Sequence, residues 1–286
     1  MIEMVFDVHV DLTGRVRKWG DVPQFCERIM KTLNFGLAQI IAIAMAFATT
    51  CLPAATLEEF KSNFYNGKIT PERVDKFIQD HPSGTIQKLV IASEGGDFIA
   101  GIKLADWVRK NGLDVEVYLL CQSACANFIF PAGKKKIIGS GALVLWHGSI
   151  EQKKVRELHL KYQTILGNNY LSPSTLGTEE RKFLDDNKVI VEALIKHREL
   201  QARFFDDIQV NEYITRLGQE PVHVGVDAWT TTVRVMEKFG IHNIEAPTNY
   251  GMPEYLRRLP TSSIHCGGKC VTFDLDEQGK AQRIGQ

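Results

Sequence analysis

The chain has 286 residues, of which 44% are apolar and 24% charged, an ordinary globular composition that can bury one sizeable core. Its 34 basic and 34 acidic residues give zero formal net charge, which disfavours binding to nucleic acid or to an anionic membrane surface. Six cysteines are too few for a dense disulfide scaffold and do not form paired CxxC zinc motifs. We therefore expect one large domain with no metal site and no cofactor.

The N-terminal region has the pattern of a signal peptide. Basic residues precede an apolar run over 35–47 and a stretch of small residues over 48–55. We expect residues 30–55 to form a signal peptide or an N-terminal anchor, and residues 1–29 to be an upstream artefact of gene calling. The protein is then expected to be periplasmic or secreted, or anchored to the membrane through residues 35–55 and facing the periplasm. A buried helix is the remaining alternative for the apolar run.

Strand and helix patterns alternate through the middle of the chain, as a parallel sheet with helical crossovers requires. Short runs rich in Val, Ile and Leu predict the strands, glycine and proline mark the turns, and amphipathic or apolar segments predict the helices. The expected strands are 87–93, 115–120, 136–138 and 142–146, and the expected helices are two within 56–81, one over 98–110 and one ending near Pro131. Pro71, directly after Thr70, is expected to begin the second helix of the first pair.

The second half of the chain contains a helical insertion and a last short helix. Charged residues with a helical period predict the insertion over about 150–218, and a turn followed by a helix is expected over 227–240, with Thr230 as its cap. The folded domain is then expected to span 56–246. Residues 247–286 show no clear period, and we expect an irregular, peripheral tail there.

Two predicted turns each join a strand to a helix, the glycine turn (residues 93–96) and the serine turn (residues 122–124). Because they follow consecutive strands, a right-handed crossover places both at the carboxyl edge of one sheet. The glycine pair allows close backbone approach, and Ser123 begins a helix whose free N–H groups favour developing negative charge. We expect Ser123 to be a nucleophile beside an oxyanion hole, with N–H donors from Gly96 or Asp97 and from Ala124. The residues of this predicted oxyanion hole are Gly95, Gly96, Asp97 and Ala124.

His147 is the candidate base. It follows the apolar strand that is expected over 142–146, and so lies at the same edge of the sheet. It would accept the Ser123 proton and return it to the leaving group, provided that a carboxylate fixes its tautomer. We assign that role to Asp227, and Asp206 and Asp207 are the alternatives.

Two pairs of cysteines are spaced for local disulfides. Cys121 and Cys125 flank Ser123, and in an oxidising compartment they would brace its turn if the local geometry brings them close; two buried thiols are the alternative. Cys266 and Cys270 are separated by a glycine pair that allows a tight loop. We expect a disulfide there as well, since His265 with these two cysteines would leave a metal site without a fourth ligand.

Four segments of the sequence resemble the proteolytic subunit of the Clp protease, and they occur in the same order as in that family. The segments are the glycine-pair stretch 91–101, the nucleophile segment 121–126 with Ala132 and Gly133, the histidine strand 144–147, and the aspartate stretch 227–230 with 238–241. The resemblance covers about residues 86–148 closely and 222–243 loosely. It implies a crotonase-like fold, a spiral of ββα units with a parallel sheet, and a Ser-His-Asp peptidase site.

The sequence also departs from this family. Glu94 stands where the family has proline, one residue is inserted between Ser123 and Ala132, and the helices after Ile150 do not resemble the family's handle. The family's ring assembly is therefore not carried over, and a homo-oligomer stays an open expectation.

The expected function is that of an exported, ATP-independent serine peptidase that acts on peptides or unfolded chains, because an exported protein has no ATP-driven unfolding partner. A catalytically inactive protein of the same fold that binds a peptide or a partner is the main alternative. A crotonase-type acyl-thioester enzyme is disfavoured by the export signal, and for a serine-lysine dyad the sequence singles out no lysine, Lys103 included.

Overall fold

The computed structural model describes residues 8–10, 16–18, 62–150, 152–168, 177–223, 226–259 and 271–285. The chain divides into two compact units, Met1–Glu58 and Glu59–Gln286. Within the first unit, β1 (Val8–Val10) and β2 (Val16–Lys18) form an antiparallel pair. The predicted signal peptide and the predicted disulfide between Cys266 and Cys270 lie outside the described residues.

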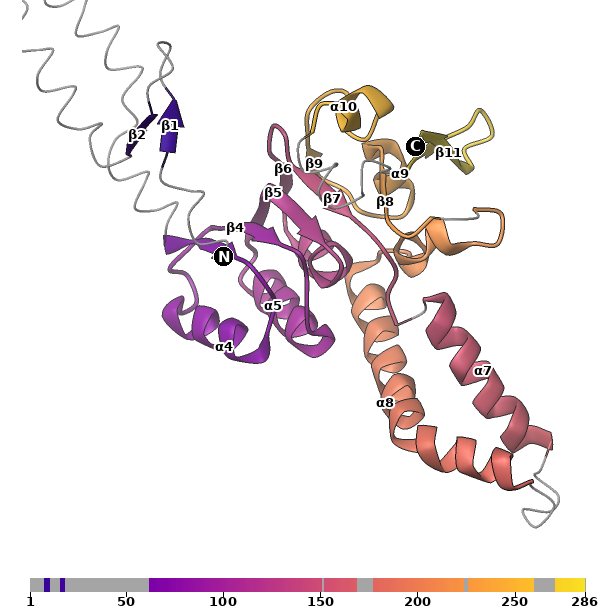
Figure 1. Ribbon diagram of the computed structural model, residues 1–286. Coiled ribbons are helices and arrows are strands. Elements are labelled where there is room, and N and C mark those ends of the chain that lie inside the picture. Colours follow the sequence, from indigo (N-terminus) through magenta and orange to yellow (C-terminus); the bar gives the residue numbers. More distant parts are fainter. Residues whose placement is uncertain are drawn as a thin grey trace, which may run out of the picture. The chain divides into compact units, whose positions relative to one another are not determined.

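The second unit is built on a parallel sheet, which contains six strands among the described residues (Figure 1). The strand order is β3-β4-β5-β6-β9, and β7 pairs with β5. All of these pairs are parallel, so the predicted α/β class with a parallel sheet is confirmed. The strands are β3 (Phe64–Asn66), β4 (Lys88–Ser93), β5 (Asp114–Gln122), β6 (Lys136–Ile138), β7 (Leu143–Leu145) and β9 (Ile244–Glu245).

Strand β5 pairs with two strands, β6 and β7, along the same edge. Its first half, Val115–Val117, pairs with β6, and its second half, Leu120–Gln122, pairs with β7. Between the halves, Tyr118 and Leu119 are 46% and 39% exposed. Because β4, β5 and β7 run in the same direction, their carboxyl ends meet at one edge of the sheet, where ligands bind in α/β folds.

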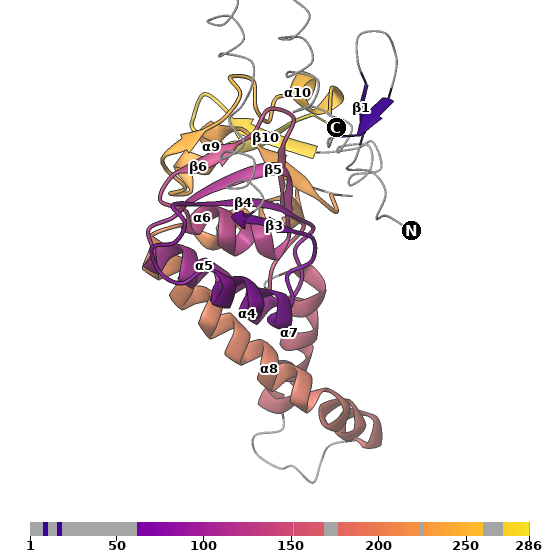
Figure 2. The same cartoon turned by 90° about the vertical axis from the view of Figure 1, so that its left-hand side faces the viewer.

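Two helices, α4 (Pro71–Asp80) and α5 (Phe98–Lys110), lie on one face of this sheet (Figures 1 and 2). Thr70 caps α4 and Asp97 caps α5, each side chain accepting a hydrogen bond from a backbone N–H three residues further on. The predicted start of α4 at Pro71 and the predicted span of α5, residues 98–110, are confirmed. The expected pair of helices within 56–81 is wrong in part, since β3 lies there and its aromatic residues pair with β4.

The predicted helical insertion forms a hairpin of α7 (Lys153–Asn168) and α8 (Thr178–Ile208), which lie side by side and extend away from the sheet (Figures 1 and 2). The C-terminal part of α8 anchors the hairpin, because Phe204 and Phe205 are buried against the core. The ring of Phe204 meets Phe128 edge to face, with centroids 5.4 Å apart.

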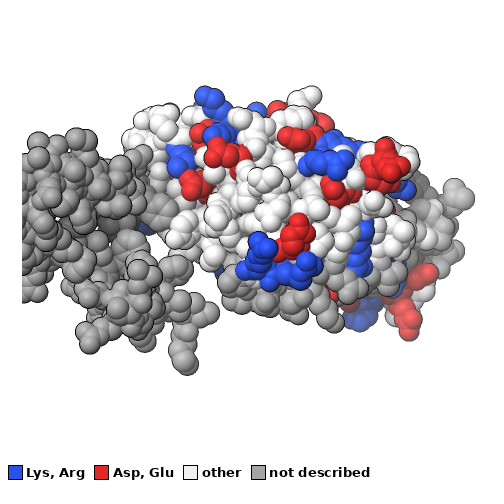
Figure 3. Space-filling model, turned by 90° about the horizontal axis from the view of Figure 1, so that it is seen from above, with Lys and Arg blue, Asp and Glu red and all other residues white. Residues whose placement is uncertain are grey.

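Charged side chains of both signs are scattered over the face of the molecule that Figure 3 shows. On the face seen in Figure 3, Lys and Arg side chains lie among Asp and Glu side chains, in keeping with the zero net charge of the whole chain. No helix in the described part of the chain is long and apolar enough to span a bilayer.

The C-terminal stretch is not an irregular tail, and that expectation is wrong. It contains α10 (Pro253–Arg257), β10 (Val271–Leu275) and β11 (Ala281–Gly285), and β10 pairs in parallel with β8 (Trp229–Thr231). The strand β10 was missed because pairing with a distant strand, rather than a long local pattern, holds it in place. Thr230 lies in β8 and caps no helix; Thr232 precedes the last predicted helix, α9 (Val233–Lys238).

Two buried tyrosines attach this C-terminal segment to β7. The Tyr250 hydroxyl accepts a hydrogen bond from the Val144 N–H (2.9 Å) and lies 3.2 Å from the Thr230 hydroxyl. Tyr255 donates to the Ala142 carbonyl (2.8 Å). Burial raises the pKa of Tyr250, so its hydroxyl stays protonated. The two tyrosines therefore provide hydrogen-bond partners for backbone groups on the edge of β7 that does not face β5.

Replacing Tyr250 by phenylalanine keeps the ring and removes this hydroxyl. The Val144 N–H is then buried without its acceptor, which costs about 1–3 kcal/mol of folding free energy. We expect urea denaturation to show that loss for Tyr250→Phe, and less than about 0.5 kcal/mol for Tyr162→Phe on α7. Equal losses for the two variants would contradict the bridging role.

Candidate active site

Ser123 occupies a strained turn between β5 and the π-helical turn η2 (Cys125–Ile129). Its φ of 57° lies in the left-handed region, which costs a non-glycine residue about 1–3 kcal/mol. The Ser123 N–H donates to the Leu145 carbonyl (3.1 Å), and the Ser123 carbonyl accepts from the Asn127 N–H (2.8 Å). A serine on a sharp, strained strand-to-helix turn is the geometry that exposes a nucleophilic hydroxyl in α/β-hydrolases.

The glycine turn packs directly on this serine turn. A Cβ atom on Gly95 would lie 2.5 Å from the Gln122 carbonyl oxygen, 2.6 Å from the Ser123 Cβ and 2.9 Å from the Ala124 nitrogen. Gly95 also has a φ of 86°, which favours glycine. The two turns are therefore neighbours in space, as the sequence predicts, and their contact leaves no room for a side chain at residue 95.

Two of the four residues of the predicted oxyanion hole have backbone N–H groups that are already engaged. The Gly95 N–H donates to a serine hydroxyl within its own turn (3.0 Å), and the Asp97 N–H donates to the Ile69 carbonyl (2.8 Å). Within the described residues, no acceptor is found for the N–H of Gly96 or of Ala124. These two N–H groups are therefore the ones available to hold an oxyanion.

A disulfide between Cys121 and Cys125 closes over the serine turn, as predicted for this pair. Both cysteines are fully buried, and their Cα atoms are 5.2 Å apart. The bond joins the end of β5 to η2, so it links the two elements whose meeting forces Ser123 into its turn.

His147 follows β7 and is half-buried. In the parallel pair of β5 and β7, Leu145 lies opposite Gln122. Ser123 and His147 are the first and second residues beyond these two partners, so they emerge from adjacent strands at the same edge of the sheet.

Two carboxamide side chains hold the backbone around His147. Gln219 donates to the His147 carbonyl (2.9 Å), and the buried Asn127 donates to the Gly148 carbonyl (2.9 Å). The Gln219 side-chain oxygen also accepts from the Lys153 N–H at the start of α7 (3.1 Å). Hydrogen bonds therefore link the backbone around His147 both to η2, through Asn127, and to the start of α7, through Gln219.

Asp227 is brought near His147 by an antiparallel bridge. Trp146 and Trp229 exchange two backbone hydrogen bonds, each 2.8 Å long. In an antiparallel pair, residues that follow one partner lie opposite residues that precede the other. His147 and Asp227 accordingly line one cleft of about 1010 Å³.

The side chains of the predicted triad are not joined. Among the described residues, no hydrogen bond links Ser123, His147 and Asp227, and Ser123 does not line the cleft that the other two share. Asp227 is exposed. Hydrogen bonds of catalytic residues are often long without substrate and tighten when it binds.

The alternative partners proposed for the site are engaged elsewhere or lie outside the cleft. Asp207 pairs with Arg109 (3.1 Å) and Lys103 pairs with Asp75 (2.5 Å). Asp206, like Asp207, does not line the cleft that contains His147. Of the three carboxylates considered, Asp227 is the one that shares a cleft with the candidate base.

Two further histidines, His159 and His223, line the same cleft. Partial burial, followed by the positive charge of Arg283, lowers the pKa of His223, which favours a neutral imidazole at pH 7. Within the described parts of the chain, no three His, Cys, Asp or Glu side chains are grouped so as to hold a metal ion.

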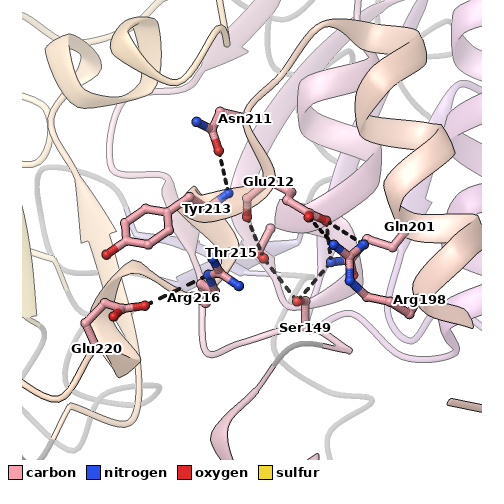
Figure 4. Close-up of polar contacts among 9 residues, drawn as sticks. All are labelled: Ser149, Arg198, Gln201, Asn211, Glu212, Tyr213, Thr215, Arg216 and Glu220. Atoms are coloured by element: carbon pink, nitrogen blue, oxygen red, sulfur yellow. Dashed lines mark hydrogen bonds and ion pairs between the residues drawn. The ribbon is translucent and has the colours of Figure 1, made fainter. Parts of the chain in front are cut away.

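The sequence analysis missed a polar network at the base of the hairpin (Figure 4). Glu212 accepts two hydrogen bonds from the Arg198 guanidinium (2.6 and 3.2 Å) and one from the Gln201 amide (3.1 Å). Gln201 is fully buried and also lies within hydrogen-bond distance of the Ser149 hydroxyl (3.2 Å). Ser149 is two residues beyond His147, so the network fixes α8 to the chain beside the candidate base.

No protein-family model matches the chain, and a search of the curated proteins finds no match. The fold and the site by themselves define an α/β protein in which a strained serine turn, a glycine turn and a histidine meet at the carboxyl edge of a parallel sheet. A hydroxyl, an imidazole and two free N–H donors are the groups that acyl transfer to serine requires.

A methyl group on Gly95 tests the contact between the two turns. We expect Gly95→Ala to lower the free energy of unfolding by about 1–3 kcal/mol more than Gly84→Ala, because only the first variant overpacks the serine turn. Gly84 is a matched control, since its φ of 84° is nearly the same and a Cβ atom there meets nothing within 4 Å. Equal losses in urea denaturation would show that the close contact does not exist.

Removing the disulfide tests its effect on stability. Closing so short a loop stabilises the fold by about 2 kcal/mol in the chain-entropy model, so we expect the Cys121→Ala/Cys125→Ala variant to lose about that amount. Wild type in dithiothreitol should lose the same amount, whereas the double variant should not respond to the reductant. Alkylation of both thiols without reductant, located by peptide mass spectrometry, would contradict the bond.

Proposed function

We propose that the protein is a serine hydrolase with a crotonase-like fold of the Clp-protease type, which cleaves peptides or unfolded chains without ATP. The strained turn of Ser123 carries this proposal. It packs on Gly95 and leaves the N–H groups of Gly96 and Ala124 without acceptors among the described residues. A turn that served only to start a helix would not need a strained serine.

In the proposed reaction, the Ser123 hydroxyl attacks the peptide carbonyl, and His147 takes the hydroxyl proton. The oxyanion receives hydrogen bonds from the Gly96 and Ala124 N–H groups. His147 then protonates the leaving amine, and water hydrolyses the acyl-enzyme. Asp227 orients the imidazole, and the substrate closes the hydrogen bonds between these side chains.

The proposed location is the periplasm or the exterior of the cell, with residues 30–55 as signal peptide or anchor. The disulfide between Cys121 and Cys125 supports this proposal, because such bonds persist in oxidising compartments. The surface charge, mixed in sign, gives no support to nucleic acid as a partner.

A peptide-binding protein without catalytic activity is the second candidate. It is favoured by the lack of any hydrogen bond among Ser123, His147 and Asp227 and by the exposure of Asp227. Such a protein would hold a chain at the same edge of the sheet and release it unchanged.

A fluorophosphonate probe separates the two candidates. In labelling, the serine oxygen bonds to phosphorus, fluoride leaves, and the hydroxyl proton passes to the base. We expect the full chain to be labelled, Ser140→Ala to be labelled equally, and Ser123→Ala and His147→Ala to lose at least about 99% of the labelling rate. All variants are checked by circular dichroism. A folded wild type that is not labelled, or labelling that survives Ser123→Ala, would overturn the hydrolase proposal.

A further inference from the structure

One face of α7 forms a wall of the cleft that contains His147 and Asp227. Residues 219–221, 223 and 226–227 also line the cleft. The cleft has a volume of about 1010 Å³ and is open to solvent, so it can admit a stretch of polypeptide. Six α7 residues, spaced so that they share one side of the helix, line the cleft: Lys153, Arg156, Glu157, His159, Leu160 and Gln163.

Two carboxylates of the cleft have a cation within 4 Å, whereas Arg156 and Asp227 form no ion pair among the described residues. Lys153 lies 3.9 Å from Glu157, and Glu220 lies 3.9 Å from Arg216. Arg156 is half-buried and forms no ion pair within the described residues. With Asp227 assigned to the imidazole of the candidate base, a guanidinium remains in the cleft without a carboxylate.

The helix that carries Arg156 begins beside the candidate base, and Arg156 lines the same cleft as His147. Gln219 hydrogen-bonds both to the His147 carbonyl (2.9 Å) and to the Lys153 N–H (3.1 Å), which fixes the first residue of α7 beside the candidate base. Arg156 follows three residues later, about 4.5 Å along the helix axis. A chain bound at the site would therefore pass this side chain within a few residues of the scissile bond.

We infer that Arg156 is a specificity-determining residue, which binds a carboxylate of the peptide substrate near the bond that is cleaved. Arginine suits this role because its planar guanidinium forms two parallel hydrogen bonds to a carboxylate. The carboxylate is either an acidic side chain or the C-terminus of the substrate. The inference rests on the proposed hydrolase function and adds the class of substrate to it.

Four fluorescent peptides test the inference: one sequence with Glu or Gln at a central position, each made with a free or an amidated C-terminus. Binding is measured by anisotropy with the full-chain Ser123→Ala variant, so that the readout needs no catalysis. We expect the better of the two carboxylates to tighten binding at least about tenfold over its neutral counterpart. Tighter binding of the Glu peptides than of the Gln peptides identifies a side-chain carboxylate. Tighter binding of the peptides with a free C-terminus identifies the terminal carboxylate.

Charge reversal then assigns the preference to one residue. In the same background, Arg156→Glu should abolish it and favour a peptide with Lys at the central position. Lys182→Glu makes the same charge change on α8, at a residue that does not line the cleft, and should preserve it. Equal binding of all peptides, or a preference that survives Arg156→Glu, overturns the inference even if the wild type is labelled by the probe. A preference that depends on Arg156 in a protein that is never labelled upholds the carboxylate site and removes the hydrolase proposal instead.

Discussion

The contact between Gly95 and the serine turn is the constraint on which the site depends. Three backbone and side-chain atoms of residues 122–124 approach the position that a Cβ atom on Gly95 would occupy. This approach holds the carboxyl ends of β4 and β5 together and keeps Ser123 at a φ that a serine would otherwise avoid. It also brings the Ala124 nitrogen to within 2.9 Å of the position of that Cβ atom, next to Gly96, the other residue whose N–H has no acceptor among the described residues.

The histidine side of the site depends on a different kind of support. Beyond β7 the chain leaves the sheet, and the carboxamides of Asn127 and Gln219 replace a strand neighbour by binding the carbonyls of Gly148 and His147. On the edge of β7 that faces away from β5, the Tyr250 hydroxyl likewise takes the place of a strand neighbour, because it accepts the hydrogen bond of the Val144 N–H. Side chains from distant parts of the chain therefore set the place of the imidazole, whereas backbone packing sets the place of the serine.

Local signals explain what the sequence could predict. Pro71 after Thr70, the amphipathic pattern over 98–110 after a glycine pair, and the short spacing of Cys121 and Cys125 each act locally, and the structure contains the helices and the bond that they indicate. The strand β10 could not be predicted, because it is held by pairing with β8, far earlier in the chain. The hydrogen bonds between Glu212 and its partners also depend on tertiary contact, as does the separation of the three triad side chains.

The helical hairpin leaves and rejoins the body of the protein at one point. Ser149, just before α7, accepts a hydrogen bond from Thr215, which follows α8. The cost of closing such an excursion grows only slowly with its length, and its described residues, 152–168 and 177–208, contain helices and no strand of the sheet. Evolution can therefore lengthen, shorten or exchange this arm while the sheet and the serine turn stay the same. In relatives with the same body, sequence variation in the arm would change the α7 side of the cleft and leave the serine turn as it is.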